Sequence, residues 1–484
     1  MPGLTLLGLG PGDPKYLTRE AWEVLSQADE VYLRTAQHPT VAGFPAGLRV
    51  HAFDDLYEQA DTFEQVYEAI VTEVLRLAQR PQGVVYAVPG HPLVAEATGT
   101  ALLQRAREAN LEVRVVEGLS FLEPVFRALG QDPFPHIALV DALELVARHT
   151  PSFPPSAPAL IAQLYSRQVA GELKLTLMAN YPDEHPVILV HGAGTADEVV
   201  EEVPLYAIDR SPHIGLLTAL WLPPLAPEAS FEAFHEVIAR LRAPNGCPWD
   251  RKQTHKSLRK YLLEETYEAL EAIDEEDWDA LKEELGDVLL QVVLHSQIAW
   301  EEGEFTLPDV LYGVTTKIIR RHPHVFSEVQ VDGVEDVLRN WAALKAQEKA
   351  AQGKPLPESA LDGIPKGLPA LMQAETLQKK AAKVGFDWED IQGVWDKVLE
   401  ELEEVRQAAT PQERAAEIGD LLFAVVNLAR WYEVRPEDAL REANARFRRR
   451  FQEVERRAKA QGRPLEEMSL EELDALWEAA KREE

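Results

Sequence analysis

Acidic residues at helical spacing dominate the stretch "KYLLEETYEALEAIDEEDWDALKEELGDVLLQVVLHS", residues 260–296. On a helix, side chains three or four residues apart share one face. Like charges on one face weaken a helix by roughly 0.2–0.5 kcal/mol per pair, so the arrangement needs a reason. The acids that share a face in this way are Glu264, Glu265 and Glu268, followed by Glu284 and Asp287.

The same pattern occurs a second time further along the chain. "VLEELEEVR" (398–406) matches "LLEETYEAL" (262–270), and "AEIGDLLFAVV" (416–426) matches "EELGDVLLQVV" (283–293). A third match, between "RFRRR" and the earlier "KIIRR", follows in the same order, so we interpret the region as a tandem duplication. The acids of the second copy are Glu400, Glu401, Glu404, Glu417 and Asp420.

Two interpretations of these acids compete. A solvated acidic face explains most glutamate clusters in a protein of formal net charge -32. Carboxylates brought together on partly buried turns would instead repel one another unless they were protonated or bound to a cation. Recurrence of the whole pattern favours the second interpretation, and a set of oxygen ligands suits Mg²⁺ or Mn²⁺.

Basic residues downstream of each acidic group predict the class of substrate that such a metal would help to bind. Lys317 and Arg321 are four residues apart after the first group, and Arg446 and Arg450 are four apart after the second. Each pair can bind phosphate oxygens, and arginine can contact two at once. Divalent metal beside such cations predicts a phosphate-bearing substrate.

The elements that position these residues differ between the two halves of the chain. In the first half, short apolar runs such as "LTLLGLG", "GVVYAVPG" and "PVILVHGAG" alternate with amphipathic stretches, which predicts an α/β domain with a mostly parallel sheet. A proline-rich break at 221–230 precedes long helical patterns, and a second break at 354–369 divides these in two. We therefore expect an α/β domain followed by two all-α modules, with boundaries 1–225, 226–353 and 354–484.

Bulk composition limits the partners and the compartment. The 484 residues include 81 acidic and 49 basic side chains, a balance that opposes nonspecific binding of nucleic acid or anionic membrane. A single cysteine, Cys247, excludes an internal disulfide framework, and we find neither a signal peptide nor an apolar run of membrane-spanning length. We expect a cytoplasmic protein that binds neither nucleic acid nor membrane.

The helical half resembles the MazG family of nucleoside triphosphate pyrophosphohydrolases. "NGCPWDRKQTHKSLRKYLLEETYEALEAI" and "KIIRRHPHVFSEV" are similar to one MazG domain, and "KVGFDWEDIQGVWDKVLEELEEV" and "ANARFRRRFQEVE" to a second. The resemblance implies an all-α bundle, usually dimeric, here a homodimer through the helical domains. It implies hydrolysis of NTPs or dNTPs to the monophosphate and pyrophosphate with Mg²⁺.

The family's metal-ligand pattern "EExxE…ExxD" corresponds to the ten acids named above. The resemblance does not decide which glutamates bind metal and which one is the base, and the candidates for catalysis are Glu265, Glu268, Glu401 and Glu404. Because the C-terminal copy carries most activity in related two-domain proteins, we favour the second copy.

Further substrate contacts have two interpretations each. Trp249 and Asp250 precede the first acidic helix and can stack on and hydrogen-bond a base, or they can anchor the loop. Asn427 and Asn444 occur in the second copy and can bond a ribose or phosphate, or simply pack within the helices.

The first half carries a glycine-rich turn, "LGLGPGDPKYLT", directly after an expected strand. Glycine there allows a ligand to approach the backbone. Residues 1–225 resemble the tetrapyrrole (corrin/porphyrin) methylases, which implies an S-adenosylmethionine pocket. His91 and the segment "VYLRTAQHP" depart from the biosynthetic enzymes and put tetrapyrrole methylation in doubt. The pocket residues we expect, each of which could also simply close a strand, are Pro11, Gly12, Gly90, Ser120 and Gly192.

Three functions follow. The leading one is a pyrophosphohydrolase fused to a methylase-like domain. The second is a methyltransferase whose helical half serves dimerisation, and the third is a sensor that binds S-adenosylmethionine and regulates the hydrolase. The duplicated acids argue against the second, because an oligomerisation face should be apolar.

Overall fold

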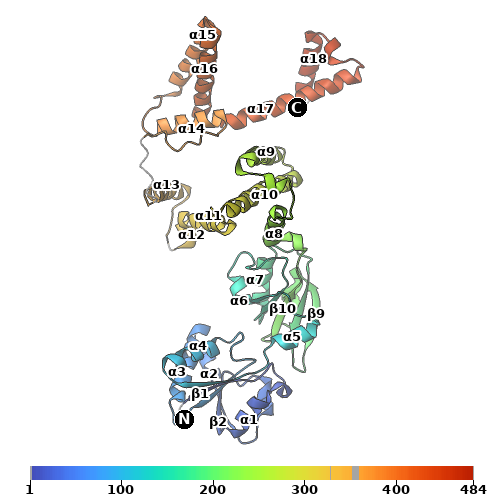
Figure 1. Cartoon of the computed structure of the whole chain (residues 1–484), viewed down its shortest axis with the longest axis vertical. Coiled ribbons are helices and arrows are strands. Elements are labelled where there is room, and N and C mark those ends of the chain that lie inside the picture. The colour runs from blue at the N-terminus through green and yellow to red at the C-terminus, as the bar shows by residue number, and fades with distance from the viewer. Residues whose placement is uncertain (1–2, 61, 328, 352–358, 483–484) are drawn as a thin grey trace. The chain divides into compact units, whose positions relative to one another are not determined.

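A computed structural model describes residues 3–60, 62–327, 329–351 and 359–482. The chain forms two compact units, of which the first ends at Leu311 and the second begins at Tyr312 (Figure 1).

The first unit opens with a parallel sheet of order β3-β2-β4-β1-β5. Side chains of β1 alternate between its faces, so Leu4 and Leu6 join one buried cluster and Leu7 another. The strands are β1 (Gly3–Gly8), β2 (Glu30–Leu33), β3 (Arg49–Ala52), β4 (Val84–Val88) and β5 (Glu112–Val116). The helices are α1 (Arg19–Gln27), α2 (Asp54–Gln59), α3 (Phe63–Ala78) and α4 (Ala97–Glu108).

A second sheet of order β6-β7-β10-β8-β9 follows in the same unit. Only its β6–β7 pairing is parallel among the described strands; the other pairings are antiparallel. The expected parallel arrangement is therefore confirmed for the first sheet but wrong for the second, because the short 192–198 turn returns β9 beside β8 without a crossover helix. The elements are β6 (Ala138–Asp141), β7 (Ala159–Ala162), β8 (Pro186–His191), β9 (Val199–Pro204), β10 (Thr218–Leu222), α5 (Leu122–Leu129), α6 (Ala142–Val146) and α7 (Arg167–Leu177).

Helices complete the first unit after the proline-rich break. They are α8 (Phe231–Arg242), α9 (His255–Asp274), α10 (Trp278–Glu302) and the start of α11 (Leu307–Arg321). Residues 275–277 connect α9 to α10, which pack against each other. Their core includes Leu258, Val293 and Ile298.

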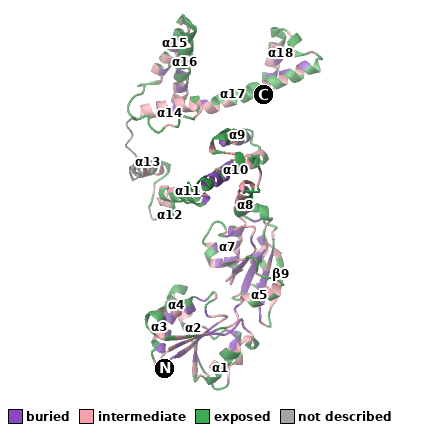
Figure 2. Cartoon of the chain, in the orientation of Figure 1, coloured by how far each residue is buried: buried purple, intermediate pink, exposed green. Residues whose placement is uncertain are grey.

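Helices are the only regular secondary structure among the described residues of the second unit. After the rest of α11 it contains α12 (Pro323–Phe326), α13 (Val334–Ala351), α14 (Ala370–Ala382), α15 (Ile391–Gln407), α16 (Pro411–Trp431), α17 (Pro436–Ala460) and α18 (Leu470–Lys481). The α15–α16 pair buries few side chains within the unit, as its green and pink ribbons show (Figure 2). A small core that includes Val454 and Leu476 joins α17 to α18.

The expected fold class, an α/β domain followed by all-α helical modules, is confirmed. None of the described helices is long and apolar enough to cross a membrane. The two domain boundaries stay a prediction, and the one between residues 353 and 354 lies outside the described residues.

Candidate functional site

The first acidic group comes together where α9 packs on α10. Glu265 and Glu268 belong to α9 and Glu284 to α10, and one carboxylate oxygen from each lies within 4.8 Å of the others. A capping box between Thr254 and Ser257 fixes the start of α9. The short connection then brings α10 back along it, so acids distant in sequence meet across the helix pair.

The carboxylates of this first cluster lie close together and repel one another. Burial raises the pKa of Glu265, and its hydrogen bond with Glu268 and the negative charges of Asp287 and Glu284 raise it further. Burial raises the pKa of Glu284, and the charges of Glu268, Asp287 and Glu283 raise it further. Glu264 and Asp287 stand outside the three-residue group, although Asp287 acts on it electrostatically.

The second acidic group forms in the same way between α15 and α16. Oxygens of Glu401, Glu417 and Asp420 lie within 4.8 Å of one another. Glu401 is only 5% exposed, and its Oε2 is buried without a hydrogen-bond partner among the described residues. Glu404 lies beside the group: burial raises its pKa, and the charges of Glu401 and Glu417 raise it further.

A lysine that our sequence analysis missed belongs to the second cluster. The Nζ of Lys397 lies 2.7 Å from Oε1 of Glu401 and 2.9 Å from Oε1 of Glu400. The hydrogen bond to Glu401, followed by that to Glu400, raises the pKa of Lys397 well above its usual range. The signal was present in the sequence as the four-residue spacing between Lys397 and Glu401, which places both on one helix face.

Both clusters have the chemistry of a site for a hard divalent cation. Their donors are carboxylate oxygens close enough to share one ion, and the unpartnered buried oxygen of Glu401 is the kind of atom that an ion would satisfy. The residues present therefore fit a metal, with Glu265, Glu268 and Glu284 as donors in the first copy and Glu401, Glu417 and Asp420 in the second.

The predicted phosphate-binding residues lie on other helices. Arg321 forms an ion pair of 2.6 Å with Glu348 in the second unit. Lys317 also belongs to that unit, whereas the first cluster belongs to the first unit, so their joint action stays a prediction. Arg446 is exposed on α17, and the guanidinium of Arg450 lies 5.9 Å from the ring centre of Trp477.

The predicted base- and sugar-binding residues are placed as follows. Trp249 is 54% exposed and meets the ring of Tyr261 edge-on, and Asp250 begins a short 3₁₀ turn beside it. Oδ1 of Asn427 accepts a hydrogen bond of 2.9 Å from Nε of Arg430, and Asn444 is exposed on α17. Their roles with substrate stay predictions.

The five residues expected to form a cofactor pocket follow strands of both sheets in the first unit. The backbones of Gly10 and Gly90 exchange two hydrogen bonds, which join the loops after β1 and β4. A Cβ on Gly12 would meet the Thr195 side chain at 2.8 Å, so the loop after β1 also touches the loop after β8. The other three are placed beside these contacts: Ser120 lies buried after β5, Gly192 begins the β8 loop with φ of 57°, and Pro11 is packed near Gly194.

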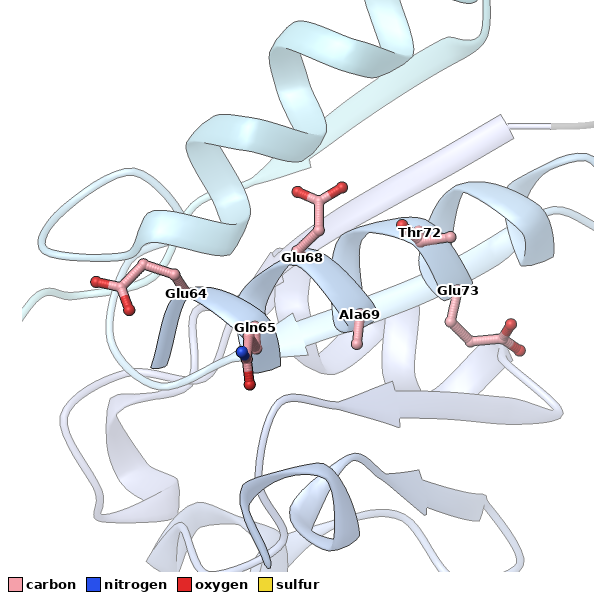
Figure 3. Close-up of a pocket in the computed structure, with 6 residues that line it drawn as sticks. All are labelled: Glu64, Gln65, Glu68, Ala69, Thr72 and Glu73. Carbon is pink, nitrogen blue, oxygen red and sulfur yellow. The ribbon is translucent and has the colours of Figure 1, made fainter. Parts of the chain in front are cut away.

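An open pocket of about 770 Å³ lies elsewhere, on the outer face of α3 (Figure 3). Figure 3 shows its lining side chains along this single helix. The described residues that line it include none of the predicted site residues, and its Glu68 pairs with Arg105 at 2.6 Å. We assign no function to this pocket.

Comparison with known proteins identifies both halves. Residues 3–209 match the model of the tetrapyrrole (corrin/porphyrin) methylases, and residues 253–326 match that of the MazG nucleotide pyrophosphohydrolase domain. The chain is 49% identical to the nucleoside triphosphate pyrophosphohydrolase/pyrophosphatase MazG of Thermotoga maritima over 251 residues, 52% of this chain and 95% of that protein. The chain belongs to the MazG family. It is thus an enzyme, a nucleoside triphosphate pyrophosphohydrolase, with an N-terminal methylase-like domain.

Two further similarities concern the whole chain and the first half of this MazG-family enzyme. The uncharacterized protein YabN of Bacillus subtilis is 47% identical over 495 residues, 99% of each chain, so the fusion of the two halves occurs there too. The solved uroporphyrin-III C-methyltransferase of Thermus thermophilus is 25% identical, with a TM-score of 0.37, and covers 46% of this chain and 94% of that one.

Proposed function

We propose that the helical half contains two MazG modules in tandem, each of which binds Mg²⁺ or Mn²⁺ and hydrolyses NTPs or dNTPs to the monophosphate and pyrophosphate. The observation that carries the proposal is the recurrence of one geometry: two helix pairs each bring three carboxylates from both helices within 4.8 Å. The 251-residue similarity to the Thermotoga protein supports two modules, because it is longer than either predicted module alone.

The metal would be held by Glu265, Glu268 and Glu284 in one module and by Glu401, Glu417 and Asp420 in the other. When bound, a divalent cation supplies charge neutralisation for the phosphates and acidifies water near neutral pH. The carboxylate that accepts the proton from attacking water should have a pKa closer to neutral than a free glutamate. Glu404 lies beside the second donor set, and its raised pKa suits it to that role.

Cations of the chain then stabilise the departing pyrophosphate. Attack at the α-phosphorus leaves negative charge on the bridging oxygen, which positioned lysine or arginine side chains offset. Arg446 and Arg450 on α17 are the candidates in the second module, and Lys317 and Arg321 on α11 in the first. Trp249 and Asp250 are the candidates for contact with the base.

A homodimer through the helical modules is part of this proposal. Matched positions of the two helix pairs expose apolar side chains, namely Leu263 and Leu399, Leu285 and Ile418, Leu289 and Leu422, and Val292 and Val425. An apolar row that recurs in both copies is suited to burial against another helix pair.

The methylase domain is proposed to bind S-adenosylmethionine at the loops that follow β1, β4, β5 and β8. Ligands of open parallel sheets bind beyond the carboxyl ends of the strands, where Gly10 and Gly90 join two of these loops. Binding with an altered rate of nucleotide hydrolysis would favour a sensor, and transfer of the methyl group would favour a methyltransferase.

A product assay tests the hydrolase. Each common NTP and dNTP is incubated with Mg²⁺, and pyrophosphate is separated from orthophosphate, with and without EDTA. We expect monophosphate plus pyrophosphate, abolished by EDTA. In a variant with Glu268→Gln, Asp287→Asn, Glu404→Gln and Asp420→Asn, turnover should fall by at least about a hundredfold, because the changes remove a metal donor from each cluster and the candidate base Glu404. Full retention of turnover in this variant would exclude both clusters as the site.

A further inference from the structure

The two acidic clusters differ in one charge. The second contains Lys397, whose Nζ contacts Glu400 and Glu401, whereas the duplicated position in the first copy is Tyr261. The ring of Tyr261 faces Trp249 and the ammonium of Lys260, so it brings no charge of its own to the acids. The second cluster therefore carries a cation of the chain where the first carries none at that position.

The ammonium of Lys397 contacts the same carboxylate that has an unpartnered oxygen in the second cluster. Lys397 contacts Oε1 of Glu401, while Oε2 of the same carboxylate is buried without a partner among the described residues. A divalent cation bound at Oε2 would lie on the same carboxylate as the ammonium, and two cations so close repel each other strongly in a partly buried site. Binding of the metal thus favours withdrawal of Lys397.

Lys397 can move its side chain away from Glu400 and Glu401. Its side chain is 36% exposed, in contrast to Glu401, and ends in a flexible four-carbon stem. An ammonium released from two carboxylates needs a new anion, and a triphosphate held at the same cluster offers one. The phosphate oxygens of the substrate would then pair with the ammonium of Lys397.

We infer that Lys397 couples divalent-cation binding to nucleotide binding in the second module. It pairs with Glu400 and Glu401 while no substrate is present, and it transfers to a phosphate oxygen when metal and nucleotide bind together. The first module, with Tyr261 at this position, lacks this lysine-mediated part of the coupling. The inference rests on the proposed function and assigns Lys397 a substrate-positioning role within it.

The test measures Mn²⁺ binding directly rather than activity. The full chain carries Glu265→Gln and Glu284→Gln, which removes the first cluster, and free Mn²⁺ is followed by its electron paramagnetic resonance signal. Titrations are made with and without a triphosphate analogue whose α–β bridge cannot be hydrolysed. In this background we expect Mn²⁺ to bind weakly alone and more tightly with the analogue.

Lys397→Met should then tighten Mn²⁺ binding without analogue by about tenfold, the scale expected when two partly exposed ion pairs stop competing. It should also reduce the tightening caused by the analogue. Lys397→Arg keeps the charge and should preserve the coupling. The matched control is Lys379→Met, which breaks a comparable pair with Glu375 on α14 and should change neither quantity.

The outcomes separate this inference from the function on which it rests. Failure of the background protein to bind Mn²⁺ overturns the metal assignment and the inference with it. Binding that Lys397→Met leaves unchanged overturns the inference alone. If Lys397→Met tightens Mn²⁺ binding but the analogue still tightens it further by the same factor, Lys397 is only a fixed counter-charge to the acids. That result also overturns the inference. Circular dichroism verifies that each variant is folded.

Discussion

Glu401 combines burial with an unused oxygen, which makes it the residue on which the second cluster depends most. It is 5% exposed, it pairs with Lys397 through Oε1, and Oε2 has no partner among the described residues. A buried carboxylate with a free oxygen is costly unless a cation completes it. Its counterpart Glu265 is less buried and surrounded by acids, so the two clusters reach similar geometry from different electrostatics.

Glu401→Gln should weaken Mn²⁺ binding at the second cluster by at least about tenfold, since even partners of metal ligands are worth about 10–100-fold in affinity. The measurement is the Mn²⁺ titration in the background that lacks the first cluster. Glu403→Gln is the control, because Glu403 lies on the same helix but is exposed and pairs with Arg406. Equal Mn²⁺ affinity in the two variants would contradict the assignment of Glu401 as a ligand.

His38 predicts a pH dependence of the methylase domain. Burial, with the nearby charge of Arg34, lowers its pKa from 6.5 to about 4. Because the folded state binds this proton more weakly than the unfolded state, the stability contribution is complete above pH 6.5 and is lost as the pH falls towards 4. Between about pH 7.5 and 5.5 the loss should be about 1 kcal/mol.

Hydrogen exchange of the amides around β2 in the full chain measures this local free energy, after correction for the intrinsic exchange rate. His38→Gln should flatten the dependence over the same pH interval. An unchanged slope in the variant would show that another group titrates.

At the scale of elements, glycines set how closely loops approach one another. A Cβ at Gly8 would lie 2.6 Å from the oxygen of Gly90 and 2.7 Å from the nitrogen of Gly118. These are backbone atoms of the β4 and β5 loops, which cannot yield as a flexible side chain does. The expected S-adenosylmethionine pocket depends on this junction.

Gly8→Ala should destabilise the methylase domain by about 2 kcal/mol or more, because overpacking of fixed atoms costs about 1–3 kcal/mol. S-adenosylmethionine binding by calorimetry should be lost, while nucleotide hydrolysis by the helical half remains. Gly171→Ala serves as the control, since its nearest atom lies 3.7 Å away on Asp209. Comparable melting temperatures of the two variants would refute the steric argument.

At the scale of the whole molecule, exposed apolar side chains predict assembly. Leu289 on α10 and Leu422 on α16 occupy matched positions and are both exposed within the chain. Burying either against a second chain would remove apolar surface from water, which is the main force of association.

The variant Leu289→Glu with Leu422→Glu should shift the protein from dimer to monomer, with the dissociation constant raised at least about tenfold by burial of unpaired charge. Sedimentation velocity of the full chain measures this. Leu175→Glu on α7, exposed but outside the helical modules, should leave the dimer intact. A parent protein that is monomeric at micromolar concentration would contradict the proposed homodimer.

Periodicity and duplication in the sequence alone determined the fold class of each half and the two acidic patterns. Apolar spacing of helices and strands depends on short stretches, so the α/β half, the helical half and the two acidic patterns were predictable from them. The parallel first sheet and the helices from Phe231 onward are confirmed. The sequence also determined that two acidic helices exist in each copy.

Only the tertiary structure decided which of those acids meet. Neighbours such as Glu264 and Glu265 diverge by about 100° around a helix, so packing of α9 on α10 brings one into the cluster and leaves the other outside. The sequence did not separate the antiparallel second sheet from a parallel one, because pairing direction depends on contacts between distant segments. The burial of Glu401 likewise depends on the surrounding fold, which no local pattern encodes.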